Sequence, residues 1–489
     1  MSMNLPGRPH PAFSQSHEPA RGMLLPPALL PVAIALFLVG GTGPNVLLAL
    51  LSIAVLVVGS VLLWRPGESP ILLFAFAYPW MQGSVAIFHA NWLGIDLANY
   101  STIPGEIRNA AALSLLGVLT LAVGMRLGAG RRRHVAELMA MRQQALAHAM
   151  QRWFQLYAWG WGASFIALSS AWIVPGLSQP MLALASLRWA FFFLLAYAYF
   201  VRVRDRGRTF PLVFLYELGA SIGGYFSDFK TVFFFTFLAV LASGVRIALS
   251  TQLAAAALTT FAGALGVVWT AVKGEYRAFI SGGQAAQAVS ADYVSRITKL
   301  FDLITGLDAE TLTRAADQLL RRISYVEFFG AVLTYVPASI PHTLGAILWD
   351  AITRPFLPRI LFPNKDVIDD TARTNLFTGG LAGHSEGTSI SLGYVAEAYI
   401  DFGEIGMFAA LLAIGIFYGT IYRALIRWRR TRGLLGMALA SAVLIGVGPL
   451  ESSFTKIFGG VAVSLLAVWL TAIFIVPRFA PWLGAGWRR

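Results

Sequence analysis

The chain has 489 residues, of which 57% are apolar and only 12% are charged. Soluble domains carry about 25% charged residues, so this composition excludes an ordinary soluble fold and predicts an all-α polytopic membrane protein. The net charge of +13 lies in short blocks between apolar runs, which is typical of cytoplasmic loops and not of a nucleic-acid-binding surface. The lack of cysteine excludes disulfides, thiolate catalysis and cysteine-ligated metals.

Apolar runs near the length that a helix needs to cross a bilayer fill most of the chain. They predict about 12 transmembrane helices, nine in a bundle at 27–272 and three in a bundle at 391–476. A large, partly helical loop at 273–390 separates the two bundles. The Pro-rich residues 1–26 predict a disordered cytoplasmic N-terminus, and 477–489 a cytoplasmic tail. The expected spans are 27–42, 45–63, 70–88, 108–126, 153–174, 180–201, 210–226, 231–249, 251–272, 400–422, 433–450 and 457–476.

The distribution of Lys and Arg predicts the orientation of these spans. With a cytoplasmic N-terminus, arginines concentrate in the inner links, such as 126–152, whereas the short outer links hold only Arg108, Lys230 and Lys456. Long loops do not count in the positive-inside rule, so the loop at 273–390 does not disturb this asymmetry. Both termini are therefore expected in the cytoplasm and the large loop in the periplasm, as in a multi-pass protein of a bacterial inner membrane.

Two segments of the large loop are predicted to be helical. Residues 308–336 have apolar side chains at helical spacing, which predicts one amphipathic helix with Asp308 as its N-cap. Pro337 is expected to end this helix. Residues 285–304 form a second, weaker helix candidate.

The same loop carries candidate substrate contacts. In a single helix over 308–336, Arg322 and Tyr325 share one face, which suits contact with a phosphate and a sugar; the alternative is a solvated stripe. Further along, Arg359 and Lys365 alternate with prolines and apolar residues. That mixture suits a segment at the membrane surface near anionic head groups.

Cations in or beside the spans are the next candidates. Arg188 lies within the sixth expected span, where a charge is costly, and Glu217 on the next span is its expected partner. The alternative to substrate binding is a purely structural ion pair. Arg277 follows Gly274 at the exit of the ninth span, and Lys230 lies in an outer turn. Both are expected to face a diphosphate, with attachment to lipid head groups as the alternative.

Candidate proton acceptors lie later in the chain. His384 stands in a G-x-S-x-G pattern, but a serine hydrolase needs a strand–turn–helix around it, which the sequence does not predict. An imidazole between glycines in an outer loop can still act as a base, and Glu397 is a second candidate. Asp366, Asp369 and Asp370 have the oxygen ligands of a hard cation, but a solvated loop is the favoured interpretation and no metal site is expected.

A local pattern in the second half of the chain resembles a known family. It consists of Pro358, Arg359 and Lys365, a Gly/Ser/Thr-rich stretch, and then Glu397-x-Tyr399-x-x-Phe402-Gly403-x-x-Gly406. This pattern, and the plan of many spans with one late outer loop, resemble the Wzy-type polymerases of O-antigen and exopolysaccharide repeat units. The resemblance implies a metal-independent glycosyltransferase without a cofactor. It would transfer a growing glycan from undecaprenyl diphosphate to a lipid-linked repeat unit.

The resemblance also implies roles for residues and partners. Loop arginines would contact the diphosphate, for which Arg277, Arg322 and Arg188 are the matching candidates. His384 or Glu397 would accept the proton of the acceptor hydroxyl. The implied partners are the undecaprenyl-diphosphate-linked oligosaccharide, membrane lipid and a chain-length regulator, with no nucleic acid.

Other functions remain open from the sequence alone. A lipid-linked oligosaccharide flippase or other transporter predicts inverted repeats and charges inside the bundle, of which only Arg188 and Glu217 are evident. An O-antigen ligase shares the plan of spans and loop. A scaffold subunit of an export complex would use the large loop as a docking surface.

Overall fold

The computed structural model describes residues 29–173, 175–202, 207–221, 229–244, 249–282, 290–358, 361–362, 364–365, 368–383, 389–431 and 433–479. Their regular structure consists of helices only, which confirms the all-α class. The predictions for residues 1–26, for Arg359 and for His384 lie outside the described residues, as does nearly all of the expected tail at 477–489.

The helices follow the apolar runs of the sequence closely. Those of the first half are α1 (Leu29–Gly40), α2 (Val46–Leu63), α3 (Ile71–Trp92), η1 (Leu97–Asn99), α4 (Ile107–Ala129), α5 (Val135–Ala147), α6 (Met150–Ile173), η2 (Pro175–Leu177), α7 (Ser178–Ser186), α8 (Arg188–Val201), α9 (Thr209–Ser221), α10 (Phe229–Ala242) and α11 (Leu249–Ile280). Those of the second half are α12 (Tyr293–Thr305), α13 (Ala309–Ile323), α14 (Glu327–Tyr335), α15 (Ala346–Thr353), η3 (Arg354–Phe356), α16 (Asp370–Thr378), α17 (Tyr394–Arg427), α18 (Leu434–Leu444), η4 (Ile445–Val447), α19 (Phe454–Leu470), the π-helical η5 (Thr471–Ile475) and α20 (Val476–Phe479).

Every expected span overlaps one helix or a run of consecutive helices in the described residues. Of the described ranges, six are long and apolar enough to cross a membrane: Val46–Leu63, Ile71–Trp92, Ile107–Ala129, Ser178–Val201, Tyr394–Arg427 and Phe454–Arg478. The shorter helices α1, α10 and α18 are also apolar. The molecule is therefore a helical protein with several helices suited to a bilayer.

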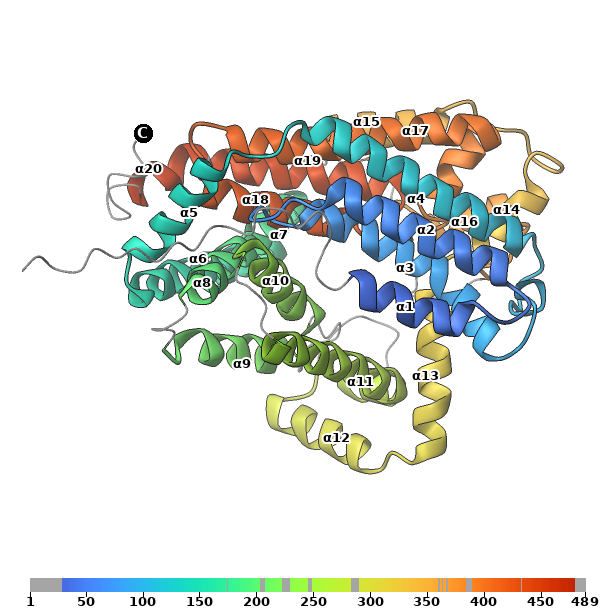
Figure 1. Ribbon diagram of the computed structural model, residues 1–489, viewed down its shortest axis with the longest axis horizontal. Coiled ribbons are helices and arrows are strands. Elements are labelled where there is room, and N and C mark those ends of the chain that lie inside the picture. The colour runs from blue at the N-terminus through green and yellow to red at the C-terminus, as the bar shows by residue number, and fades with distance from the viewer. Residues whose placement is uncertain are drawn as a thin grey trace, which may run out of the picture.

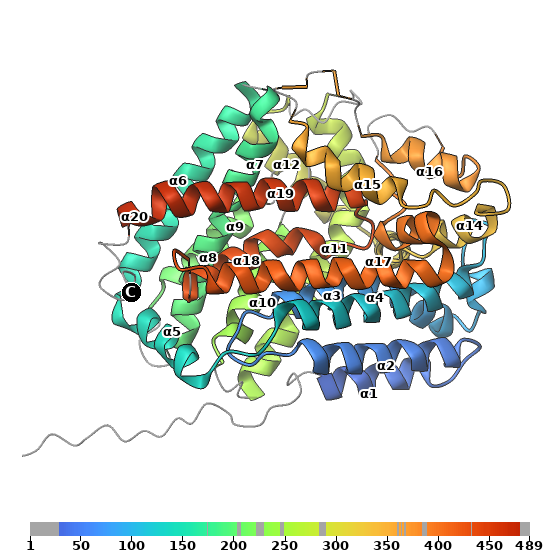
Figure 2. The ribbon, with the colours of Figure 1, turned by 90° about the horizontal axis from the view of Figure 1, so that it is seen from above.

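The long helices lie side by side in one main body. Figure 2 shows α19, α17, α4, α2 and α1 running in nearly the same direction, with α6 and α7 inclined at one end. At the other end, the short helices α14, α15 and α16 gather beside the start of α17. Figure 1 shows α9, α11 and α12 beneath the main body, with α13 running back up to it. The helices of the expected large loop thus lie at one end and along one flank.

Small residues hold α4 and α17 together along their length. Gly124 and Gly128 on α4 face Gly415 and Gly419 on α17, and both pairs have the small-xxx-small spacing of closely packed membrane helices. A Cβ atom added at Gly128 or Gly415 would lie 2.2 Å from a backbone carbonyl oxygen of the other helix. These four positions, the glycine seam, therefore have no room for a side chain, and α17 is fixed against α4.

The helices of the large loop begin where capping residues predict. Asp308 accepts a hydrogen bond from the Thr311 N–H at 2.7 Å and caps α13, as expected. Of the weaker helix expected over 285–304, only the part from Tyr293 is present, as α12, and the Asp292 side chain caps it; residues 285–289 lie outside the described residues. The pKa of Asp308 is lowered because the backbone and side chain of Thr311 donate to its carboxylate.

The single helix expected over 308–336 is wrong, because the chain breaks into α13 and α14. Ser324 is extended, with φ −62° and ψ 128°, and the Tyr325 N–H leaves the helix to donate to the Gln82 carbonyl oxygen of α3 at 3.1 Å. This long-range bond removes Tyr325 from the helical face that it was expected to share with Arg322. The tyrosine instead lies at the junction of the loop with the main body.

Candidate functional site

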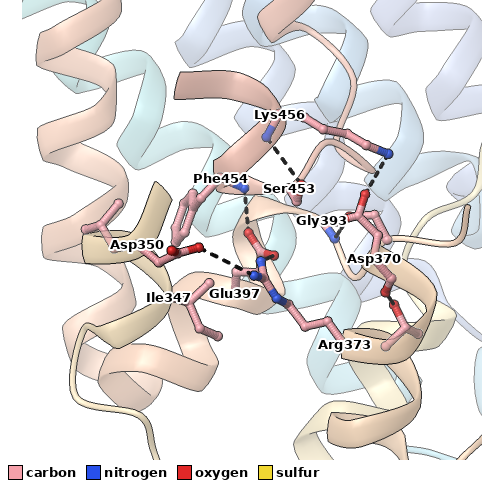
Figure 3. Close-up of polar contacts among 12 residues, drawn as sticks. Ile347, Asp350, Asp370, Arg373, Gly393, Glu397, Ser453, Phe454 and Lys456 are labelled. Carbon is pink, nitrogen blue, oxygen red and sulfur yellow. Dashed lines mark hydrogen bonds and ion pairs between the residues drawn. The ribbon is translucent and has the colours of Figure 1, made fainter. Parts of the chain in front are cut away.

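Ionisable side chains from separate segments meet where the large loop joins the main body, and Figure 3 shows Asp370, Arg373, Glu397 and Lys456 among them. The segments are the link between α13 and α14, the helix α16, the start of α17, and the loop before α19 with the first turn of that helix. We name this group the polar cluster; its members are Tyr325, Asp370, Arg373, Glu397, Glu451 and Lys456.

Glu397 is the most enclosed member of the polar cluster, with 1% of its surface exposed. It lies in the first turn of α17, one turn after Gly393, whose φ of 84° suits glycine. Arg373 Nη1 donates to Oε1 of Glu397 at 2.9 Å, and the Phe454 N–H donates to Oε2 at 2.5 Å. Phe454 is the first residue of α19, so the carboxylate lies at the positive end of that helix dipole.

Arg373 connects this buried carboxylate to the loop helices. It lies on α16, and its Nη2 is 4.0 Å from an oxygen of Asp350 on α15. Asp350 is also 3.7 Å from Nη1 of Arg354, the first residue of η3. Arg373 keeps 24% of its side chain exposed, while Glu397 is buried. The buried acid therefore anchors a cation that reaches the surface.

A second acid–cation pair repeats this arrangement. Lys456 Nζ is 2.6 Å from Oδ2 of Asp370, with 46% of the lysine side chain but only 2% of the aspartate side chain exposed. Ser389 approaches both partners, at 3.4 Å from Asp370 and 3.3 Å from Lys456. In the described part of the chain, the buried Oδ1 of Asp370 accepts no hydrogen bond. Of the two buried acids, only Asp370 therefore has a carboxylate oxygen that accepts no hydrogen bond from the described residues.

Tyr325 lies on the inner side of the polar cluster. Burial raises the pKa of its phenol, and the charges of Glu451, Asp370 and Glu397 raise it further. The Gln82 side chain fixes the neighbouring loop, donating to Glu451 at 2.5 Å and accepting from the Leu450 N–H at 2.6 Å. The tyrosine therefore stays a neutral hydrogen-bonding group near three carboxylates.

Asp401, one helical turn after Glu397, holds α15 in place. It is fully buried and accepts hydrogen bonds from the N–H groups of Ile347 at 3.1 Å and Leu348 at 2.8 Å, and from the Thr343 hydroxyl at 2.5 Å. Asp401 thus caps the start of α15. Two residues later Gly403, with φ 70° and ψ −174°, kinks α17.

The predicted ion pair of Arg188 and Glu217 is present, but it lies away from the polar cluster. The two side chains are 3.8 Å apart, and the Tyr157 hydroxyl donates to Glu217 at 2.5 Å. Arg188 lines a mostly apolar cavity of about 320 Å³ that Thr471 also lines. Thr471 follows Phe454 by 17 positions along the helix of α19, about 26 Å at 1.5 Å per residue. Arg188 therefore lies toward the opposite end of α19.

Other predicted site residues lie in different surroundings. Arg277 and Arg322 lie close enough to Lys273 to repel its positive charge. The three cations thus form a second basic group where α11 packs on α13. Lys230 is exposed in the first turn of α10. Lys365 donates to the carbonyl oxygens of residues 354 and 357, at 2.5 and 2.9 Å, and so closes the turn after η3.

Sequence reasoning brought only Glu397 and Tyr325 into the polar cluster and missed the residues that pair with the acids. The sequence pattern does not single out Arg373, suggests Asp370 only as a ligand of a cation, and suggests Lys456 only as part of a cationic rim with Lys230 and Arg277. One local feature of the sequence points to Arg373: Asp369 caps α16, and Arg373 follows one turn later on that helix. Nothing in the sequence showed that these residues meet Glu397.

Comparison with known proteins gives one family match. No curated protein and no solved structure matches the chain. A family model described as a domain of unknown function, DUF8712, matches residues 107–428. The match begins with α4 and ends just after α17, so it includes Tyr325, Asp370, Arg373 and Glu397. The chain belongs to the family of this domain of unknown function.

Proposed function

We propose that this protein is a glycosyltransferase that joins undecaprenyl-diphosphate-linked oligosaccharide repeat units at the outer face of a bacterial inner membrane. The observation that carries the proposal is the polar cluster, in which two buried acids each hold a partly exposed cation. Such a group suits a substrate that carries both a diphosphate and sugar hydroxyls. It lies at the junction of the helical body with the large loop, where a lipid-linked sugar would meet the protein.

The proposal includes a topology of about 12 spans with both termini in the cytoplasm. In support of it, each expected span overlaps one or more helices, and six ranges have the length and composition of membrane helices. The short helices α14, α15 and α16 then belong to a periplasmic loop. Membrane lipid and a chain-length regulator are the further proposed partners.

Arg373 and Lys456 are the proposed contacts of the leaving diphosphate. Both cations are partly exposed, whereas their acid partners are buried, so each has donors directed away from the core. A guanidinium donates in a planar fork that matches phosphate oxygens, and positive charge stabilises the negative charge that develops on a leaving group. The second basic group, with Arg277 and Arg322, is the proposed contact of the second lipid diphosphate.

Asp370 is the better proposed base of the two buried acids. In the transfer, the acceptor hydroxyl oxygen bonds to the anomeric carbon, the bond from that carbon to the diphosphate oxygen breaks with its electron pair, and a carboxylate takes the hydroxyl proton. Both oxygens of Glu397 already accept hydrogen bonds. Oδ1 of Asp370 accepts none from the described residues, which favours Asp370 as base and Glu397 as a positioning residue.

The test is the lipid-linked glycan profile of cells that carry Arg373→Lys. Lysine keeps the charge but loses the bidentate fork, so long-chain glycan should fall strongly while single lipid-linked repeats accumulate on the outer face. Arg373→Ala should have the larger effect. Removing one partner of a buried ion pair costs about 3–5 kcal/mol, so the protein level of each variant must be measured. The double variant Arg373→Gln with Glu397→Gln replaces the ion pair by two neutral amides and so leaves no buried charge unpaired.

Arg314→Ala is the matched control, because Arg314 is an exposed cation of the same loop. Normal chain length with Arg373→Lys at wild-type protein level would remove this site from the mechanism. Repeats that accumulate on the cytoplasmic side in a deletion strain would favour a flippase. Full-length glycan that fails only to reach its final acceptor would favour a ligase.

A further inference from the structure

A group of exposed apolar side chains borders the polar cluster on the side of α15 and η3. We name it the apolar band; its members are Leu344, Trp349, Phe356, Leu361 and Ile405. The least exposed of these, Trp349, shows 69% of its surface. Water-exposed loops rarely present large apolar side chains together, and such patches mark interaction surfaces.

The apolar band is held on a fixed support. On the opposite face of α15, Ile347 and Ala351 are buried. Asp401 binds the first N–H groups of this helix, and Lys365 closes the turn after η3. The exposed side chains are therefore presented by an anchored helix and not by a frayed loop.

The apolar band continues onto helices suited to the bilayer. α15 packs against α19 and α17, which belong to two of the six ranges able to cross a membrane. A Cβ added at Gly345 would lie 3.1 Å from the Phe402 ring, so the start of α15 touches the kink of α17. Ile405, just past the kink, extends the band along α17. The band therefore lies beside two helices that are long and apolar enough to cross a bilayer.

The charges beside the apolar band point to lipid as its partner. Asp350 and Arg354, the two ionisable residues at 344–358, lie 3.7 Å apart, and Asp350 also faces Arg373 of the polar cluster. Both ionisable groups therefore have an oppositely charged partner. Tryptophan is enriched where hydrocarbon meets head groups, and Trp349 and Phe356 supply aromatic surface there. An apolar face with charge at its edge is the pattern of helices that lie in a membrane interface.

We propose that the apolar band lies in the outer interfacial layer of the bilayer, with phospholipid head groups and the upper acyl chains as its partner. This proposal does not depend on the glycosyltransferase function. It makes α15 and η3 a membrane-surface element, although neither crosses the bilayer.

Site-directed spin labelling tests this placement. The chain has no cysteine, so each single-cysteine variant carries one label. Trp349→Cys, Phe356→Cys and Leu361→Cys report on the band. Ala372→Cys, exposed on α16, is the aqueous control, and Leu466→Cys, 46% exposed on α19, is the lipid reference. The labelled full-length protein is placed in phosphatidylcholine–phosphatidylglycerol vesicles, and collision rates with oxygen and with a water-soluble nickel complex are measured.

We expect the ratio of oxygen to nickel collisions at all three band labels to lie above that at Ala372 and below that at Leu466. A ratio equal to that at Ala372 would place the band in water and overturn the proposal. Labels that are immobile and shielded from both reagents would overturn it in favour of a protein partner. Because the native side chains are exposed, the labels replace few buried contacts, and all three must agree.

Discussion

At the residue scale, the candidate site consists of ion pairs in which the acid is buried and the cation is partly exposed. Glu397 and Asp370 are buried, whereas Arg373 and Lys456 reach the surface. A buried carboxylate without its cation would be costly, so each acid fixes where its partner's charge is presented. The proposed substrate contacts, Arg373 and Lys456, are thus paired with acids that are buried in the fold.

Gly403 is a residue-scale test of how the site is positioned. Its φ of 70° with ψ −174° is open to glycine and strained for other residues, at a cost of about 1–3 kcal/mol. Gly403→Ala should lower the melting temperature and long-chain glycan together, because the kink sets the direction of the turn that carries Glu397 and Asp401.

Gly459→Ala is the control, since an added Cβ at this helical glycine meets nothing within 4 Å. It should leave the melting temperature unchanged or slightly raised, because alanine favours helix. Equal effects of the two substitutions would show that the kink does not strain a side chain.

At the element scale, two kinds of contact set the architecture. The glycine seam holds α4 to α17 by close approach of their backbones. Hydrogen bonds to helix N-termini hold the end of the molecule beside the polar cluster, where Glu397 meets α19 and Asp401 meets α15. The close contact with α4 thus fixes α17, and Glu397 and Asp401 of α17 then fix the starts of α19 and α15.

Gly415→Val tests the glycine seam. The added side chain would collide with a carbonyl oxygen of α4 at 2.2 Å and push the helices apart. Overpacking costs about 1–3 kcal/mol, so thermal unfolding in detergent should shift several degrees downward. Gly460→Val on α19 meets nothing within 4 Å and should have little effect beyond its helix propensity. A normal melting temperature for Gly415→Val would mean that the two helices do not touch here.

At the scale of the whole molecule, the apolar runs predict most of the helices. Each expected span overlaps one or more helices, because an apolar run long enough to cross a bilayer has few other stable structures. The break at Ser324 was not foreseeable, since it depends on a hydrogen bond from Tyr325 to Gln82, far away in sequence. The pairing of Arg373 with Glu397 and of Lys456 with Asp370 likewise needs tertiary proximity that spacing does not encode.

A topology reporter tests the orientation of the molecule. Alkaline phosphatase inserted after Ala338, an exposed position between α14 and α15, should be active because that loop is proposed to lie in the periplasm. The same enzyme inserted after Arg131, between α4 and α5, should be inactive in the cytoplasm. The reverse pattern would invert the topology and exclude the proposed site for a periplasmic substrate.

The opening turns of α17 have a mechanical consequence. Glu397 and Asp401 are four residues apart and so lie on one side of the helix, the first gripping α16 and α19 and the second gripping α15. The first two turns of α17 thus tie three other helices to one segment, so the charges around Arg373 keep their spacing only while α15, α16 and α19 stay in place.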